Sequence, residues 1–274
     1  WVIKSSVDNV KNVLDKYGCY YEITEPEKGE QMPILLKQNS LADPFQSITD
    51  LYSTPSVNDI DPTPFLAPFY FIFFGLMLSD AAYGLILTAG SFAALKMFRL
   101  EGMMKRLFKM FMLCGISTFF WGAMFGGWFG DMFGIPAIWF NPVEEPMTLL
   151  VFSLILGAIH LFVGMGLKAY LLIRNGQAID AICDIFLWYL LLIGLVVFAV
   201  GGTIAPVVKT IGSGMSIVGA LGILVTGGRN KKGIGKITGG LGSLYGITSY
   251  LSDVLSYSRL LALGLATGVV SQVI

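Results

Sequence analysis

The sequence is poor in charge, histidine and cysteine, and each shortage excludes a class of protein. Only 13% of the 274 residues are charged, about half the share found in an ordinary soluble domain, which excludes a soluble enzyme. The 18 basic and 18 acidic residues cancel, which excludes a basic nucleic-acid-binding protein. One histidine and three separated cysteines, without a Cys-x-x-Cys pair, predict neither a metal centre nor a disulfide framework.

Long apolar runs take the place of these residues. Hydrophobic residues make up 55% of the chain, and several runs approach or exceed the roughly 20 residues that a helix needs to cross hydrocarbon. The sequence therefore predicts an all-α polytopic membrane protein, a bundle whose main solvent is the lipid bilayer. The runs cover residues 65–98, 107–132, 147–173, 182–205, 211–227 and 237–274.

The first run is too long for one straight helix. Its 34 residues would extend about 51 Å, whereas the hydrocarbon core is about 30 Å thick. The polar residues and glycine of its middle, Ser79–Gly84, predict a break into two short helices. Two passes there give seven transmembrane helices in all, and one pass is the alternative. The last run is also too long to be entirely transmembrane, and we expect its glycine-rich start to lie along the interface.

Residues 1–64 differ in composition from the rest. They hold 10 of the 18 acidic residues and five lysines. Apolar residues between 7 and 14 recur at helical spacing, and Tyr20–Ile23 and Pro33–Leu36 are typical of short strands. This is too little to bury a core alone, so we expect the α+β end of a larger cytoplasmic domain and a linker. Residues 65–274 are predicted to form the transmembrane domain.

The basic residues predict the orientation, because Lys and Arg favour the cytoplasmic side. Residues 132–146 hold no Lys or Arg, and 203–210 hold only Lys209. With a two-pass first run, residues 1–64 are cytoplasmic, and so are 16 of the 18 basic residues. The clusters that follow the first, third and fifth runs are Lys96, Arg99, Lys105, Arg106 and Lys109, then Lys168 and Arg174, then Arg229, Lys231, Lys232 and Lys236.

Arg259 is the one basic residue left inside a membrane segment. An arginine at bilayer depth costs at least about 2.5–3.5 kcal/mol, and it cannot release its proton as a lysine can. Asp253, six residues away, does not share its helix face, so an ion pair within the chain is the weaker interpretation. Small or weakly polar residues fill the face of Arg259 and allow close helix approach: Ser252, Leu255, Ser256, Ala262, Leu263 and Ala266. We expect the partner to come from another helix, of another subunit.

The other intramembrane polar residues are weaker signals. Asp80 lies in the predicted break, and Asp131 closes the second run at its outer end. His160 lies mid-membrane, where it is either a hydrogen-bonded packing residue or part of a proton path. Asp180 and Asp184 flank an inner helix start, where carboxylates suit a helix N-terminus, and we interpret them as caps.

No catalytic motif is present. The sequence has no GxxxxGK[ST], no GxSxG and no metal-binding pattern, so the chain itself is not expected to hydrolyse nucleotides or to bind a cofactor. Gly122, Gly126 and Gly130 recur every four residues, which predicts close helix packing.

Three stretches together resemble a known family. They are Asp61–Gly84, Phe119–Asp131 and, most specifically, Leu251–Ala266 with the sequence LSDVLSYSRLLALGLA. They are similar, in order, to blocks of the membrane half of the V/A-type ATPase stator subunit, which is called a in eukaryotes and I in bacteria and archaea. The short loops look bacterial or archaeal.

The resemblance implies a fold and a role. The fold has eight membrane helices, the last two long and tilted, and the eighth, with a second arginine, would follow Ile274. The subunit faces a rotating ring of proteolipids, each with one ion-binding carboxylate, and two half-channels reach that ring from opposite sides. At the position of Arg259 an arginine separates the half-channels and exchanges H⁺ or Na⁺ on the ring carboxylates.

The resemblance also implies site residues and partners. Ser256, Asp253, Asp80, Asp131 and His160 become candidates for the ion path, and the helix face of Ser252, Ala262, Leu263 and Ala266 becomes ring-facing. Implied partners are the proteolipid c/K ring, E/G peripheral-stalk subunits bound through the cytoplasmic domain, and a d/C-type central-stalk subunit. The expected location is a prokaryotic plasma membrane.

Two other functions compete with the stator. A secondary transporter would bind a small solute at a broken helix, but the sequence shows no second broken segment in a matching repeat. A purely structural anchor would gain nothing from a buried cation such as Arg259.

Overall fold

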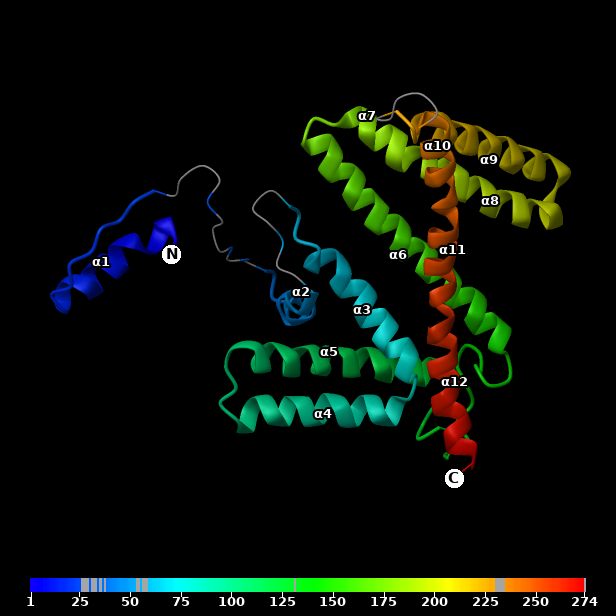
Figure 1. Ribbon diagram of the computed structural model, residues 1–274. Coiled ribbons are helices and arrows are strands. Elements are labelled where there is room, and N and C mark those ends of the chain that lie inside the picture. The colour runs from blue at the N-terminus through cyan, green and yellow to red at the C-terminus, as the bar shows by residue number, and fades with distance from the viewer. Residues whose placement is uncertain are drawn as a thin grey trace.

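The structure is a computed structural model, and the regular elements of the residues it describes are all helices (Figure 1). These are residues 1–25, 30, 34, 36, 38–52, 55, 59–130, 132–229 and 235–273. Within them no strand occurs, which confirms the all-α prediction. The predicted strand at Tyr20–Ile23 is wrong, because no neighbouring strand pairs with it. Its expected companion, Pro33–Leu36, lies partly outside the described residues, and the described Ile34 and Leu36 are not in a strand.

The N-terminal residues contribute short helices. The turn η1 (Lys4–Ser6) leads into α1 (Val7–Lys16), which buries none of its residues. The turn η2 (Asp43–Phe45) and α2 (Gln46–Tyr52) follow. Phe45 is buried against Ala67, Met110 and Cys114, so this short segment is docked on the membrane helices.

The first apolar run is two helices, as predicted. They are α3 (Thr63–Leu78) and α4 (Ala81–Met97). Ser79 ends α3 in the left-handed conformation with φ 39°, and Asp80 caps α4 by accepting hydrogen bonds from the N–H groups of Ala82 and Tyr83 at 2.9 and 3.1 Å. At about 24 and 26 Å, each helix is shorter than the hydrocarbon core.

Helix α5 (Gly102–Phe125) packs antiparallel to α4 as a hairpin. Gly122 allows this contact, since a Cβ there would collide with the backbone of Ala81. The predicted glycine stripe is otherwise wrong. Gly126 takes φ 78° and ends the helix, and Gly130 lies in the loop beyond it.

A second hairpin follows the longest helix. Helix α6 (Pro146–Arg174) leads through α7 (Ala178–Ala181) and the π-helical turn η3 (Ile182–Phe186) into α8 (Leu187–Ile204), which pairs with α9 (Pro206–Thr226). Four helices of the described residues are long and apolar enough to cross a membrane: Gly102–Phe125, Pro146–Arg174, Ala178–Gly202 and Pro206–Thr226. The full count of seven therefore stays a prediction.

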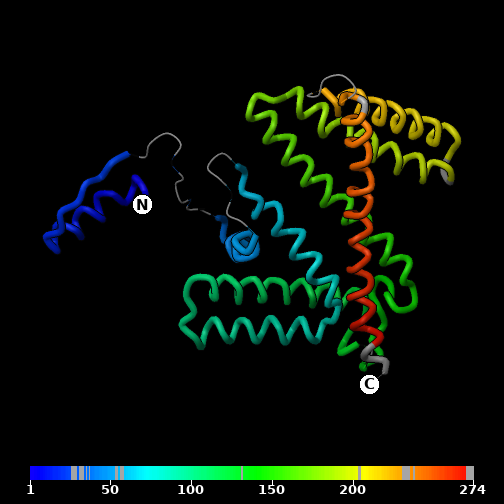
Figure 2. The backbone as a smooth tube through the Cα atoms, in the orientation of Figure 1, coloured from blue at the N-terminus to red at the C-terminus, as the bar shows by residue number. Residues whose placement is uncertain are grey.

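The last apolar run is a long helical path with two interruptions. It comprises α10 (Gly235–Tyr245), α11 (Ile247–Ser256) and α12 (Ser258–Val273). Figures 1 and 2 show that this path runs across the direction of both hairpins and crosses α6. The basic ends of the two hairpins lie on the same side of this view. The charge rule predicts that this side is cytoplasmic. The last path is steeply inclined to the direction of the two hairpins.

Candidate functional site

Arg259 lies in the first turn of α12 and is exposed. Its Nε donates a hydrogen bond to the carbonyl oxygen of Ser256 at 3.0 Å. Among the ion pairs of the described residues, none joins Arg259 to a carboxylate. Asp253 is exposed and is not paired with it. The guanidinium is thus open toward whatever lies outside the chain.

The last helical path has two different faces. Leu260 is only 6% exposed, and the next turn is held close to Leu149 through Gly264. Leu263, on the side of Arg259, is 44% exposed. The residues predicted to share the face of Arg259 are exposed in the structure, apart from Ser256, which is half-buried: Ser252, Leu255, Ala262, Leu263 and Ala266.

Tyr257, between α11 and α12, docks the path on α6. Its hydroxyl is hydrogen-bonded to Nδ1 of His160 at 2.7 Å. Its ring lies against Gly157, where any Cβ would collide with it. Phe69 of α3 stacks on the His160 ring at 4.5 Å between centroids. His160 is therefore hydrogen-bonded and packed among aromatic rings in this structure, and it stays a candidate for the ion path.

The position of Tyr257 determines the direction of Arg259. Two residues correspond to about 200° around a helix, so a tyrosine held on α6 turns the arginine to the opposite side. The hydrogen bond to His160 fixes the rotation of the helix as well as its distance from α6. The structure thus holds Tyr257 on His160 and places Arg259 on the other side of the path.

For the ATPase stator subunit that the sequence resembles, we expect Tyr257→Phe to weaken ion transport about fivefold, without loss of assembly. The phenyl ring keeps the packing on Gly157, and only the hydroxyl that holds His160 is lost, a bond worth about 1 kcal/mol. ATP-driven ion uptake into vesicles, normalised to assembled complex, measures the effect.

The matched control is Tyr250→Phe. Tyr250 packs on Trp188 with ring centroids 4.7 Å apart, about two turns before Tyr257, and we expect its loss of a hydroxyl to leave transport unchanged. His160→Ala should add little to Tyr257→Phe, because each removes the same bond. Additive losses in the double variant would contradict a shared positioning role.

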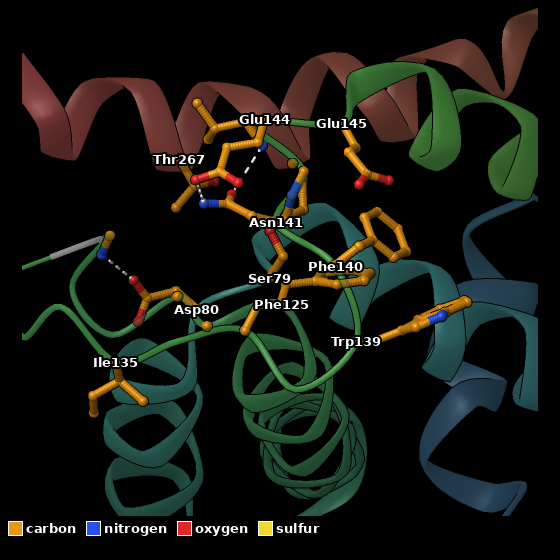
Figure 3. A pocket seen from close by; sticks show the side chains of 18 of the residues that line it. Ser79, Asp80, Phe125, Ile135, Trp139, Phe140, Asn141, Glu144, Glu145 and Thr267 are labelled. Carbon is orange, nitrogen blue, oxygen red and sulfur yellow. Dashed lines mark hydrogen bonds between the residues drawn. The ribbon is translucent and has the colours of Figure 1, made fainter.

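A cavity of about 500 Å³ lies beside the C-terminal half of α12. Figure 3 shows its walls, which come from the α3–α4 turn, the loop between α5 and α6, and α12. Its first residue on α12, Gly264, is five positions beyond Arg259, or about 8 Å along the helix. Polar side chains line it: Ser79, Asp80, Asn141, Glu144, Glu145 and Thr267.

Asp80 lines this cavity, but its carboxylate is already occupied. Besides the two N–H groups of α4, it accepts a hydrogen bond from the N–H of Gly130 at 2.7 Å, and Asp80 is 1% exposed. The geometry makes it a link between the α3–α4 turn and the loop after α5. Asp131, the other acidic candidate there, lies outside the described residues.

Sequence reasoning missed Glu144 and Glu145 as site residues. Both are exposed and line the cavity. Asn141 donates a long hydrogen bond to Glu144 at 3.5 Å, and Thr148 donates one to Glu145 at 3.0 Å. The available signal was a pair of acidic residues in a loop without Lys or Arg. From the sequence alone this pair indicated only how the chain is oriented in the membrane, because the nearness of α12 is visible only in the fold.

Asp180 and Asp184 form an ion-pair cluster instead of helix caps. Arg229 donates to both carboxylate oxygens of Asp184 at 3.0 and 2.8 Å, and to Asp180 at 2.7 Å. The hydrogen bond from Asp184 raises the pKa of Arg229 above its ordinary value, so the guanidinium stays charged. The cluster ties the turn after α9 to α7 and η3, and it lies apart from Arg259.

Comparison with known proteins identifies the family. The sequence profile of the V-type ATPase 116kDa subunit family matches residues 1–145, more than half of the chain. The chain belongs to this family. Members of this ATPase family are non-catalytic membrane subunits of the complex, in agreement with the apolar helices of the fold.

Relatives in the ATPase family cover the rest of the chain. A-type ATP synthase subunit I of Methanocaldococcus jannaschii is 33% identical over 98% of this chain and 44% of its own length. The protein of the same name from Thermococcus kodakarensis is 32% identical over 100% of this chain and 43% of its own. V-type ATP synthase subunit I of Chlamydia trachomatis is 25% identical over 100% of this chain and 52% of its own length. The chain thus spans about half the length of these curated relatives.

Proposed function

We propose that this chain is the membrane part of the stator of a rotary V/A-type ATPase, and that Arg259 exchanges H⁺ or Na⁺ on the carboxylates of a rotating proteolipid ring. An ion-loaded, neutral carboxylate crosses lipid at low cost, whereas a bare one does not. A fixed guanidinium attracts the carboxylate, releases its ion and blocks a direct leak between two half-channels.

One observation carries this proposal. Arg259, on a helix that the sequence predicts to lie in the membrane, is exposed on a face of mostly small or weakly polar side chains, and the described part of the chain offers it no carboxylate partner. Such a cation is costly in lipid, and a charge-assisted contact with a partner carboxylate offsets that cost. The small residues of the same face let the partner helix approach closely.

The cavity beside α12 supports an outer half-channel. Its lining includes the loop that the charge rule predicts to lie outside, and on α12 it reaches Gly264, five positions beyond Arg259. Glu144 and Glu145 provide negative charge that concentrates cations at its mouth. Asp80 serves this path by holding its wall together, while Asp131, Asp253 and Ser256 remain candidates for direct contact with the ion.

The wider assembly follows from the same proposal. Residues 1–64 are the end of a cytoplasmic domain that binds E/G peripheral-stalk subunits, and residues 65–274 are the ion-translocating domain. The c/K ring contacts the face of Arg259, and a d/C-type subunit joins the ring to the central stalk. The membrane is a prokaryotic plasma membrane, and nucleotide hydrolysis takes place in other subunits.

Disulfide cross-linking in the whole complex tests the contact with the ring. Cysteine at Ala266 or Leu263 should cross-link to a cysteine placed one turn from the ring carboxylate, because these side chains are exposed on the face of Arg259. The background replaces the natural cysteines by alanine: Cys19, Cys114 and Cys183. Cross-linked dimers of the stator and proteolipid subunits, detected by immunoblot, are the readout.

Leu260→Cys is the matched control, since it lies on the same helix but faces the bundle. We expect it to give no cross-link. Equal cross-linking from cysteines at positions 260 and 263 would overturn the assignment of the Arg259 side of α12 as the face that contacts the ring. A complex that purifies without a proteolipid ring would favour the transporter or the anchor.

A further inference from the structure

We propose that the groove at the cytoplasmic end of the α4–α5 hairpin binds an anionic phospholipid, with the phosphate between two lysines and an acyl chain along the apolar wall. This site is separate from Arg259 and from the cavity beside α12. It needs the membrane orientation but not the ion-exchange mechanism.

Three segments form the groove, whose volume is about 470 Å³. Helices α4 and α5 provide two walls, and the segment that leads into η2 provides the third. Its lining is mainly apolar, with two ammonium groups: Ser40, Leu41, Pro44, Phe92, Leu95, Lys96, Lys109, Met112 and Leu113.

On both helices the lysine lies nearer the cytoplasmic end, and the apolar residues of the groove lie deeper in the membrane. Helix α4 runs toward the cytoplasmic end, and Phe92 lies one turn before Lys96, about 6 Å deeper. Helix α5 runs the other way, and Met112 and Leu113 lie about one turn deeper than Lys109. A lipid phosphate at the lysines therefore has apolar wall beneath it on both sides.

The charges of the groove are not balanced within the described chain. Arg106 is paired with Asp43 at 3.1 Å and lies 4.0 Å from Asp50, and this contact also holds the third wall against α5. Among the ion pairs of the described residues, none includes Lys96 or Lys109. Two lysines without an ion-pair partner in the described chain thus line one groove at the predicted boundary of the membrane.

The combination of charge and apolar wall selects the occupant. A zwitterionic lipid would leave net positive charge uncompensated, and free phosphate would leave the apolar wall unexplained. An anionic phospholipid satisfies both features, as basic pockets between helices on the cytoplasmic side do for such headgroups. The long lysine stems cover the upper apolar surface while their charged ends reach the phosphate.

Native mass spectrometry of the purified whole complex tests the site, with phosphatidylglycerol and phosphatidylcholine as probes. We expect Lys96→Gln with Lys109→Gln to weaken phosphatidylglycerol binding to this subunit about 25-fold, from about fivefold for each lysine. Binding of phosphatidylcholine should not change. Complex assembly and the thermal midpoint, measured alongside, show that the variant folds.

The matched control removes two charges from the same end but outside the groove, through Arg99→Gln with Lys105→Gln. Both side chains are exposed, and we expect less than a twofold effect. An equal loss in the control would mean diffuse attraction and overturn the site. Glycerol phosphate that displaces the lipid at equal concentration would show a free-phosphate site. A wild-type complex that retains no phosphatidylglycerol would mean that another segment or subunit fills the groove, and this would also overturn the proposal.

Discussion

Arg259→Ala is expected to abolish ATP-driven ion transport in a complex that still assembles. The guanidinium contacts no carboxylate within the described chain, so its removal breaks no internal ion pair, and its backbone bond to Ser256 is a local one. Loss of one partner of a desolvated pair costs about 3–5 kcal/mol, a fall in transport of at least about a hundredfold. Ion uptake into vesicles, with assembly checked by pull-down, measures both quantities.

Arg259→Lys separates charge from geometry. A compact ammonium keeps the charge but not the planar fork of the guanidinium, and it can lose its proton when desolvated. We therefore expect it to fail substantially too. Arg99→Ala, which removes an exposed arginine outside the helices, should transport normally. Normal pumping by the alanine variant at position 259 would reduce Arg259 to a structural residue and reopen the transporter and anchor interpretations.

Asp80→Ala is expected to destabilise the subunit by about 3 kcal/mol, the largest effect on stability that we predict. One carboxylate accepts three backbone hydrogen bonds, from Ala82, Tyr83 and Gly130, and each unsatisfied buried donor costs about 1–3 kcal/mol. Loss of a helix cap alone accounts for about 1 kcal/mol. The thermal midpoint of the detergent-solubilised subunit is the measurement.

Asp80→Asn should fall between the wild type and alanine. The amide oxygen can still cap α4, but the amide nitrogen cannot accept the bond from Gly130. Asp253→Ala, at an exposed position in α11, should leave the midpoint unchanged. If Asp80→Ala kept full stability but stopped transport, Asp80 would belong to the ion path and not to the wall.

The helices were predictable from hydrophobicity, but their ends were not. The run 107–132 overshoots α5, which ends at Phe125 because Gly126 adopts a left-handed conformation. The residues that follow, among them Trp128 and Phe129, are as apolar as the helix. Composition therefore cannot show where the α5 helix ends and the loop after it begins. The break at Asp80 was predictable because a polar residue there interrupts a run that is too long. A strand at Tyr20–Ile23 needed a partner that the pattern alone does not supply.

The site was predictable only where it depends on one helix. The period of α11 and α12 gives the small-residue face of Arg259, since residues on one helix face recur at fixed spacing. The bond between His160 and Tyr257 joins residues 97 positions apart, and the pairing of Arg229 with Asp180 joins residues 49 apart. Such contacts depend on how α6 and the hairpins cross, which no local pattern encodes.

The oblique course of the last helical path changes what a residue number along it means. In an upright helix, successive turns sample successive depths of the bilayer. In α11 and α12, which cross the direction of the hairpins (Figure 1), successive turns also sample successive angles around the circumference of the proposed ring. In the proposed stator, an arginine moved by one turn, to position 263, would meet each ring carboxylate earlier or later in the rotary cycle. In the proposed function, the position of Arg259 along this path sets when the guanidinium meets each ring carboxylate.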